Sequence, residues 1–595
     1  MALRRVIKDI KQLSIVSAAS TAASSQQQIA SKWAGVITSF VGELNGRAPL
    51  EGGPGVTPMS VSRALQDVAR FAPQTGRPLV SAMLPHLLAE REQKLLPTLA
   101  EFGPIELAYM SNSIANIITA SSPAPDSKEL LRRFGEQVGE YFSKPGRLEA
   151  VPIYAMVTLT NALNRLGYDG ASRRRAGDLY ARFDRLCCDR MESMNASDIA
   201  VALQSFHNGG CRHAKPSHEL LGKAAQRLKG DLRHQPKIPS KSLAQLLNIF
   251  VTFGYKQDRE LLLLFFDSVM STPVEELEIF CAPLALNSLS KCSHVINEGA
   301  KSGLSPTTAI VFNLATKHIL PRLNELGPCQ VANVVNALGS LKVLDYRLLK
   351  GMSHLIVNSD GGHTVPLDSF SFQELSNISH GFAKIAYGSS NLYQALFDEA
   401  SRRQKRFDAQ GVSMFLDSVR RVANRWYNGM LRDPNRPGPQ PGLRYIPYAL
   451  MEAISKLVTS CEAWSVERLT AERGGGIGVQ SSTQILLCLV ELGRGSRSST
   501  SPLAKCFGLD TDKDSQPPSE APSVCHLLLA SLKGHSGRLT KEQARHVAHA
   551  SRRYKACDTD EYQALPPEVL RWVEDVQREF PAGARSGRVA VTSSE

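Results

Sequence analysis

One stretch of the sequence gathers polar side chains that could form a chemical site. Residues 370–388 read FSFQELSNISHGFAKIAYG and contain Glu374, His380 and Lys384. The stretch is either a reactive cluster or one copy of a repeat. A common pattern recurs along the chain: a small residue, three intervening positions, a polar residue, and then small and apolar residues. Other copies hold Asn, Gln or Asp at the position of His380, so we interpret His380 as a repeat position and not as a lone catalytic histidine.

The polar position recurs at intervals of 37 to 49 residues between residues 66 and 417, which falls among the periods of helical repeats. Its clearest occupants are Asn112, Asn161, Gln204, Asn248, Asn287, Asn336 and His380. One interpretation is a ladder of hydrogen bonds between stacked repeats, and the other is a row of groups facing a ligand on a concave surface. We favour the ladder, because buried amides are as a rule hydrogen-bonded.

Clustered cations supply a second kind of chemistry, the neutralisation of phosphates. The chain has 69 Lys and Arg residues against 56 acidic residues, a net charge of +13, which favours an anionic partner. The candidate phosphate contacts are Arg173, Arg174, Arg175, Arg402, Arg403, Lys405, Arg406, Arg420, Arg421, Arg425, Arg552 and Arg553. The clusters at 402–406 and 420–425 could line one edge of the fold. Trp426 and Tyr427 follow them and could stack on a base, although each cluster alone is more typical of a solvated helix end.

Motifs for catalysis or metal binding fail on spacing. The acidic run at 510–514 lacks the Gly and Glu that a calcium loop requires, and Cys211, His213 and His218 lack a fourth ligand. The eleven cysteines form no framework, and no HExxH, GxSxG or Walker motif is present. We therefore expect no enzymatic activity, no metal, no cofactor and no small-molecule substrate.

The elements that carry these positions read as helices. Leu243, Leu247 and Phe250 lie on one helical face, and no run of alternating apolar and polar residues predicts strands. The longest apolar run, residues 261–266, is far shorter than a membrane span of about 20 residues, so no transmembrane segment is expected. The predicted fold class is all-α, an α-solenoid of stacked helical hairpins with irregular repeats of roughly 35–50 residues.

Composition divides the chain into five parts. Residues 1–30 are basic, rich in Ser and Ala, and amphipathic on a helix, which is typical of a mitochondrial targeting leader. The alternative is a plain N-terminal helix. The repeat solenoid is predicted at 31–430, a Pro/Gly linker at 431–443, a divergent helical region at 444–580 and a disordered tail at 581–595. The predicted location is the mitochondrial matrix.

The stretch at 370–388 resembles the repeat unit of octotricopeptide and heptatricopeptide repeat proteins and of RAP-domain and Fas-activated-kinase-like proteins. The residues that carry the likeness are Glu374, Leu375, Ser376, Asn377, Phe382, Ala383 and Lys384. The resemblance covers roughly residues 55–425 and implies an organellar, usually mitochondrial, RNA-associated solenoid. Ser379 stands where these families have tryptophan, and no RAP-like module is recognisable near the C-terminal end.

We therefore expect a non-catalytic mitochondrial RNA-associated protein. Its predicted partners are mitochondrial RNA, above all ribosomal RNA, and other ribosomal or organellar proteins. A lineage-specific component of the mitochondrial ribosome and a transcript-maturation factor both fit this expectation. The alternative is a protein-only scaffold or an accessory subunit of a mitochondrial membrane complex. A basic stripe on the solenoid would favour RNA, whereas a large exposed apolar patch would favour protein partners.

Overall fold

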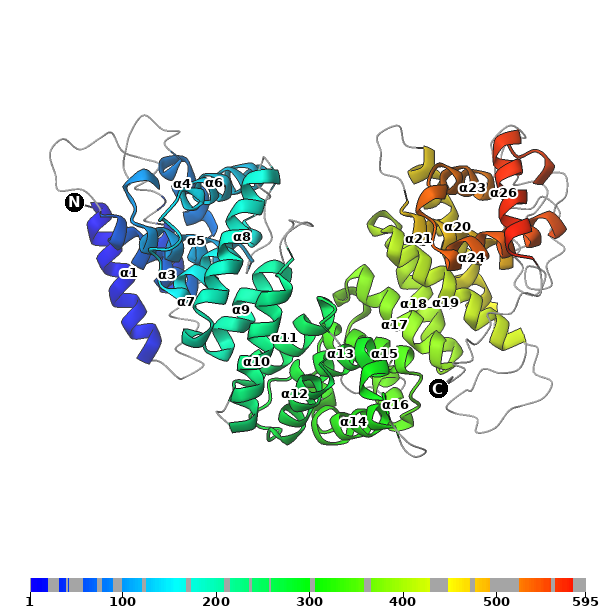
Figure 1. Ribbon diagram of the computed structural model, residues 1–595, viewed down its shortest axis with the longest axis horizontal. Coiled ribbons are helices and arrows are strands. Elements are labelled where there is room, and N and C mark those ends of the chain that lie inside the picture. Colours follow the sequence, from blue (N-terminus) through cyan, green and yellow to red (C-terminus); the bar gives the residue numbers. More distant parts are fainter. Residues whose placement is uncertain are drawn as a thin grey trace, which may run out of the picture. The chain divides into compact units, whose positions relative to one another are not determined.

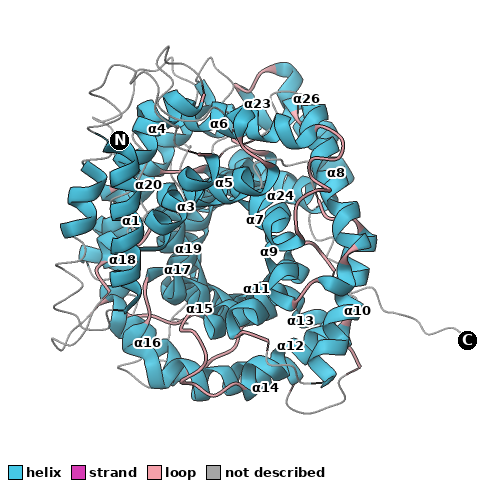
Figure 2. Ribbon diagram, turned by 90° about the vertical axis from the view of Figure 1, so that its left-hand side faces the viewer, coloured by secondary structure: helices cyan, strands magenta, loops and turns pink. Residues whose placement is uncertain are grey.

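The fold is all-α and consists of stacked helical hairpins, which confirms the predicted fold class. The computed structural model describes residues 2–19, 31–38, 41, 57–71, 77–88, 99–119, 125–166, 168, 173–207, 215–234, 238–255, 258–299, 305–357, 365–427, 448–470, 477–492, 524–557 and 562–581. Figure 2 shows helices and loops, and no strand, among these residues. The chain divides into two compact units, Met1–Thr272 and Pro273–Glu595, and each is described by itself.

The first unit consists of two rows of helices (Figure 1). Its A helices are α1 (Ala2–Ala19), α3 (Pro58–Phe71), α5 (Pro104–Thr119), α7 (Ile153–Arg165), α9 (Ala196–His207) and α11 (Ser240–Thr252). Its B helices are α4 (Arg77–Leu87), α6 (Pro125–Ser143), α8 (Arg173–Asp189), α10 (His218–His234) and α12 (Arg259–Ser271). Each A helix packs against the next A helix, and each B helix packs against the next B helix.

The second unit also alternates A and B helices along the chain. Its A helices are α13 (Cys281–Ile296), α15 (Pro328–Leu341), α17 (Phe372–Ile385), α19 (Ala409–Tyr427), α21 (Val479–Glu491) and α24 (Lys541–Cys557). Its B helices are α14 (Pro306–Leu314), α16 (Tyr346–Ile356), α18 (Ser390–Arg402), α20 (Tyr448–Thr470), α23 (Val524–Gly534) and α26 (Pro567–Glu579). The A row runs from α13 to α24 without a break, so helical stacking continues past residue 444.

Helix α17 shows how the local sequence determines an A helix. Ser371 and Glu374 form a capping box at its start, in which each side chain accepts a hydrogen bond from the other residue's backbone. Leu375, Ile378 and Phe382 recur at three- and four-residue spacing and are fully buried. The interior side of the helix is therefore apolar, and the polar repeat position lies on its other side.

The A helices α15 and α17 pack backbone to backbone at two glycines. A Cβ atom at Gly381 would lie 2.5 Å from the carbonyl oxygen of Val335, and one at Gly339 would lie 2.6 Å from the Cα atom of Gly381. No side chain fits into such a gap. This contact fixes the position of His380, the neighbour of Gly381, relative to α15.

Residues of the predicted leader form helix α1, which packs against α3. Val6, Ile10 and Leu13 are buried on its inner side. Trp33 lies beside it: its indole Nε1 donates a hydrogen bond to Ser17 Oγ at 3.0 Å, and its ring stacks on Phe71. The apolar side of helix α1 thus packs against α3, the next A helix. The role of these residues in targeting stays a prediction.

Two segments that were predicted from the sequence fall wholly or almost wholly outside the described residues. The predicted linker at 431–443 lies outside the described residues, as does nearly all of the predicted tail at 581–595. Within the described part of the chain, no helix combines the length and the apolar character needed to cross a bilayer.

Candidate functional site

The polar repeat positions lie on the solvent side of the A helices, which we call the A face. From α5 to α17 the polar residue of each A helix is half-buried, while residues next to it in the sequence are buried. We call these residues the amide column: Asn112, Asn161, Gln204 and Asn248 in the first unit, and Asn287, Asn336 and the imidazole-bearing His380 in the second. Further half-buried amides at Asn116, Gln245, Asn333 and Asn377 lie three or four residues away on the same helices. The A face of each unit therefore presents many groups that both donate and accept hydrogen bonds.

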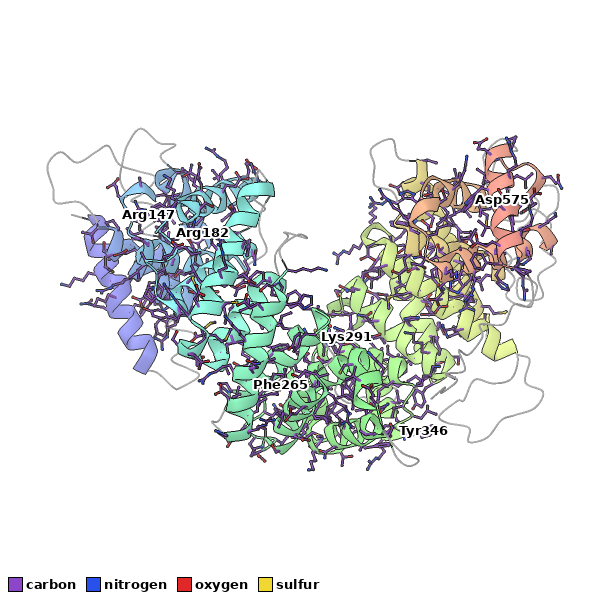
Figure 3. All side chains as sticks on the ribbon, in the orientation of Figure 1. Arg147, Arg182, Phe265, Lys291, Tyr346 and Asp575 are labelled. Carbon is purple, nitrogen blue, oxygen red and sulfur yellow. The ribbon has the colours of Figure 1, made fainter. Side chains whose placement is uncertain are left out.

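A second column lies four residues after the amide column, one turn along each helix. Its cationic members are Arg165, Lys291, Lys384 and Arg421, which we call the basic column. Lys291, labelled in Figure 3, is exposed on α13, and the other three are half-buried. Because side chains four residues apart on a helix are neighbours, each cation lies beside a polar side chain of the repeat position.

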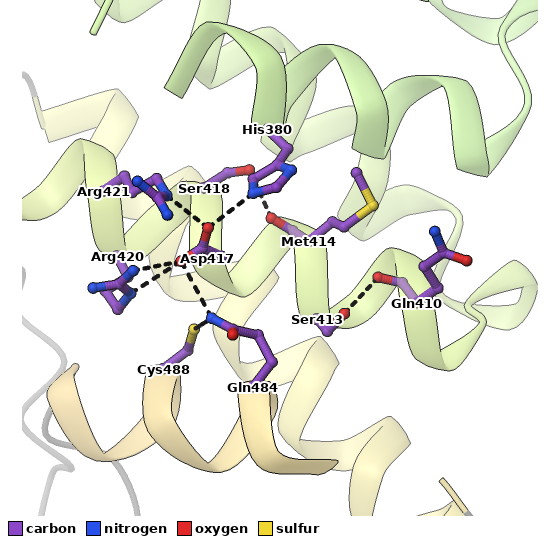
Figure 4. A network of polar contacts seen from close by, with 10 residues as sticks. All are labelled: His380, Gln410, Ser413, Met414, Asp417, Ser418, Arg420, Arg421, Gln484 and Cys488. Carbon is purple, nitrogen blue, oxygen red and sulfur yellow. Dashed lines mark hydrogen bonds and ion pairs between the residues drawn. The ribbon is translucent and has the colours of Figure 1, made fainter. Parts of the chain in front are cut away.

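A polar network joins three consecutive A helices of the second unit (Figure 4). Its centre is Asp417 on α19, which is only 4% exposed. Asp417 Oδ2 accepts hydrogen bonds from His380 Nε2 on α17 at 2.9 Å and from Arg421 Nε at 2.6 Å. Asp417 Oδ1 accepts from Arg420 Nη2 at 2.6 Å and from Gln484 Nε2 on α21 at 3.3 Å. The carboxylate thus holds two guanidinium groups in place near the A face.

The charges around Asp417 shift the pKa values of three groups. Burial alone would raise the pKa of Asp417, but the His380 hydrogen bond and the two guanidiniums hold it well below its usual range. Burial lowers the pKa of His380 against the opposing effect of its bond to Asp417. Burial and the charge of Arg421 lower the pKa of Lys384. Arg420, Arg421 and Lys384 lie around the buried carboxylate of Asp417. The cluster therefore carries excess positive charge, which favours binding of an anion.

A similar contact connects two A helices of the first unit. Arg165 Nη2 donates to Asn112 Oδ1 at 2.9 Å, and Arg165 Nη1 donates to Asn116 Oδ1 at 2.6 Å. Burial lowers the pKa of Arg165. Both amide oxygens accept from the guanidinium, which leaves the amide nitrogens of both asparagines to donate elsewhere. By contrast, the buried Oδ1 of Asn161 has no hydrogen-bond partner, so a ladder does not account for every member of the column.

An aromatic pair on the A face was not predicted from the sequence. Tyr109 on α5 and Tyr154 on α7 lie with ring centroids 6.1 Å apart, and Tyr154 is 47% exposed. Burial and a hydrogen bond with Tyr154 raise the pKa of Tyr109 to about 12, so its hydroxyl stays protonated. An exposed aromatic ring beside amides and cations offers a platform on which a base can stack.

The predicted cluster at 402–406 lies apart from the A face. It occupies the end of the B helix α18 and the short 3-10 helix η6 (Gln404–Arg406), whereas Arg420 and Arg421 lie on the A helix α19. That the two clusters line one edge stays a prediction. Arg402 pairs with Glu399 at 2.7 Å, whereas Lys405 and Arg406 are exposed.

Two of the predicted phosphate contacts, Arg403 and Arg552, donate hydrogen bonds to backbone carbonyls. Arg403 is 7% exposed and donates to Glu399 and to the backbone carbonyls of Leu367 and Phe370. Arg552 donates to the carbonyl of Phe580 at 2.8 Å, at the end of α26. The guanidinium of buried Arg403 satisfies carbonyls inside the fold, and half-buried Arg552 satisfies carbonyls at the end of α26 with one nitrogen. Phosphate contact by either residue stays a prediction. Arg553 remains exposed on α24.

The side chains of Arg173, Arg174, Arg175, Arg425, Trp426 and Tyr427 lie outside the described residues. The basic column could have been recognised from the sequence, because its members stand four positions after Asn161, Asn287, His380 and Asp417.

Cations of the B helices are mostly engaged with carboxylates. Arg182 pairs with Glu149 at 2.6 Å, and Lys229 pairs with Asp258 at 2.8 Å. Pairs of this kind cancel the local field of the cation. The B row is therefore less suited to a polyanion than the A face.

Two further features of the described residues bear on metal binding and nucleophilic chemistry. No group of three or more His, Cys, Asp or Glu in this part of the chain could hold a metal ion. A shallow groove of about 540 Å³ between α8 and α10 is lined by residues including Cys188, Glu192, Lys223 and Arg227. Burial raises the pKa of the Cys188 thiol to about 11, so it is a poor nucleophile at neutral pH.

No family model matches the sequence, and no curated protein is significantly similar to it. Among solved structures, the chain is similar to the pentatricopeptide repeat protein PPR10 in complex with an 18-nucleotide psaJ RNA element. That match has a TM-score of 0.16 and 10% identity and covers 92% of this chain and 90% of that chain. PPR10 from maize matches with a TM-score of 0.15 and 11% identity, over 96% and 99% of the two chains. TM-scores this low carry no information about function, and the assignment of the fold rests on the helices described above.

Proposed function

We propose that this protein is a non-catalytic helical-repeat protein that binds single-stranded RNA on its A face. The observation that carries the proposal is the pairing of the amide column with the basic column on the same helices. Amides can hydrogen-bond to the edges of unstacked bases, and cations one turn away can neutralise the phosphates. Tyr154 adds a ring on which a base can stack.

The distribution of apolar side chains supports RNA over a protein-only scaffold. In the described part of the chain, the exposed large apolar residues are Met59, Ile105, Tyr154, Leu344 and Tyr346. They lie on α3, α5, α7 and around the start of α16. Met59, Ile105 and Tyr154 stand near the starts of three A helices that pack in a row, and Leu344 and Tyr346 lie together. Five residues in two groups are fewer than the contiguous apolar core that a protein interface of standard size needs.

The finer parts of the proposal rest on the sequence. The basic leader with few acidic residues supports a location in mitochondria. The resemblance of residues 370–388 to octotricopeptide-type repeats supports a role with organellar transcripts. We propose a component of the mitochondrial ribosome that contacts ribosomal RNA, with a transcript-maturation factor as the near variant.

Photo-crosslinking tests the proposed binding face. The full chain is incubated with an unstructured RNA that carries 4-thiouridine, irradiated, digested and mapped by mass spectrometry. We expect crosslinked peptides from the A helices, including α7 around Tyr154 and α17 around His380. Crosslinks confined to the B helices, or a chain that binds no RNA, would contradict the proposal.

A further inference from the structure

Helix α24 carries a line of exposed basic residues that belongs to neither column. Lys541, Arg545, His549 and Arg553 follow one another at every fourth position, and all four are exposed. Residues four apart are neighbours on a helix, and the line extends over about 18 Å. We call these four residues the α24 stripe.

The packing of α24 places the stripe on the solvent side of the A row. The helix lies between α21 and α26, and it contacts both. Val547, Ala548, Ser551 and Tyr554 are buried on its inner side. The remaining side of the helix is the one that carries the stripe.

One cation of the stripe packs on an aromatic ring: the guanidinium of Arg545 lies over the ring of Phe580, 5.7 Å from its centroid. Two of the four acidic residues of the neighbouring helix α26 pair with cations outside the stripe, Glu568 with Lys533 and Asp575 with Arg578. Helix α24 itself contains five Lys and Arg residues and one acidic residue, Glu542. Like charges four residues apart destabilise a helix, so an anion bound along the stripe would relieve a repulsion.

We propose that the α24 stripe contacts the phosphates of the RNA strand and reads no bases. This inference rests on the proposed RNA binding and assigns a separate, sequence-independent part of it to α24. The one side-chain amide of this helix, Gln543, accepts a hydrogen bond from the backbone of Thr540 and caps the helix start. The stripe thus offers basic side chains one helical turn apart, with no amide among them, and such a row suits the successive phosphates of a strand.

An acidic protein is a weaker occupant than RNA. None of the exposed large apolar side chains in the described part of the chain lies on α21, α23, α24 or α26. A protein partner would need an apolar core around which the charges form a rim, whereas a phosphate backbone needs cations alone.

The test compares two triple variants with equal changes in charge. Lys541→Gln, Arg545→Gln and Arg553→Gln alter the stripe, and Lys456→Gln, Arg571→Gln and Arg578→Gln alter exposed cations of the B helices α20 and α26. Binding of fluorescent oligo(U), oligo(A) and oligo(C) of 30 nucleotides is measured by anisotropy between 0.05 and 0.3 M salt. Circular dichroism and thermal unfolding confirm that both variants fold.

We expect the stripe variant to bind all three RNAs up to roughly a hundredfold more weakly at 0.1 M salt, with unchanged ratios between them. Its slope of log affinity against log salt should be smaller by about 2, since each lost phosphate contact removes about 0.7 for a single strand. If wild type binds RNA and the stripe variant shows the same salt slope as wild type, the inference is overturned and the proposed function is left intact. A wild-type chain that binds no RNA at any salt overturns both, and a variant that changes the ratios between RNAs contradicts phosphate-only contact.

Discussion

His380 Nε2 donates a hydrogen bond to Asp417 Oδ2 at 2.9 Å and thereby joins two consecutive A helices through their repeat positions. Asp417 simultaneously accepts from Arg420 and Arg421, so the same carboxylate that completes the ladder also positions cations at the A face. The two interpretations of the polar repeat position, a ladder and a ligand-facing row, therefore coexist at this pair.

Removing the carboxylate should destabilise the second unit. In Asp417→Asn, Arg420, Arg421 and Lys384 lose the buried negative charge of Asp417. We expect the free energy of unfolding to fall by about 3–5 kcal/mol, as when one partner of a buried ion pair is deleted. Denaturant unfolding measures the change. The matched control is Asp398→Asn, an exposed carboxylate on α18, and an equal loss in both variants would refute this role of Asp417.

The network should make stability depend on pH through His380. Burial lowers the pKa of His380 in the folded chain, so the unfolded chain binds the proton more tightly. Stability should therefore fall as pH drops from about 7.5 through the ordinary histidine pKa near 6.5. We expect His380→Gln to reduce this slope and His294→Gln, on the exposed side of α13, to leave it unchanged. Thermal unfolding at several pH values measures this slope. If stability falls with pH equally in wild type and in His380→Gln, His380 is not the source of the pH dependence.

The close contact of α15 and α17 should not tolerate a methyl group. In Gly381→Ala the new Cβ would meet the carbonyl oxygen of Val335, so the two helices must separate. We expect a loss of about 1–3 kcal/mol in the free energy of unfolding, typical of overpacking. Gly534→Ala, at a glycine whose Cβ position is open, serves as the control. Equal unfolding midpoints for the two variants would show that α15 and α17 pack less closely.

Helix α1 should stabilise the first unit as its terminal layer. Ile10 is fully buried, whereas Gln12 is exposed on the same helix. Ile10→Asp loses a buried apolar side chain and introduces a charge at that position, so we expect it to lower the free energy of unfolding by about 2–5 kcal/mol. Gln12→Asp should change it by less than about 0.5 kcal/mol. If both variants unfold at the wild-type temperature, α1 does not cover α3 in solution.

Tyr154 should contribute to RNA affinity by stacking. We expect Tyr154→Ala to weaken binding of an unstructured RNA by about 1–3 kcal/mol, the usual contribution of one base on an aromatic ring. The control is Tyr346→Ala, which removes a tyrosine of similar exposure, 49%, from the B helix α16. Anisotropy titrations compare the two, and equal affinities would place the base-stacking site elsewhere.

The sequence predicts the fold of this protein better than its site. Apolar spacing and the recurring polar position lead directly to stacked helices, because a helix that buries one side must repeat its apolar residues at that period. The role of each cation depends on neighbours distant in sequence. Arg403 meets the carbonyl of Phe370 only after folding, and Arg552 meets that of Phe580 in the same way. Runs of arginine therefore drew the prediction toward residues with structural roles.

Two members of the basic column are absent from the phosphate contacts predicted from the sequence. Lys291 lies outside the arginine clusters, and the sequence assigns Lys384 only to the repeat at 370–388; both stand four positions after a polar repeat residue. Tyr154 likewise forms an aromatic pair with Tyr109 of the preceding A helix, which is distant in the sequence. Local composition does not reveal these residues. The cations can be recognised because each stands four residues after a polar repeat position.

The most direct measurement of the central claim is the affinity of the full chain for an unstructured 30-nucleotide RNA across a salt series. Wild type is compared with the A-face variant Lys291→Gln plus Lys384→Gln and with the B-row variant Lys223→Gln plus Lys456→Gln. We predict salt-dependent binding by wild type, with a slope smaller by about 1.4 in the A-face variant and unchanged in the B-row variant. Equal slopes in both variants, or no binding by wild type, would contradict RNA binding on the A face.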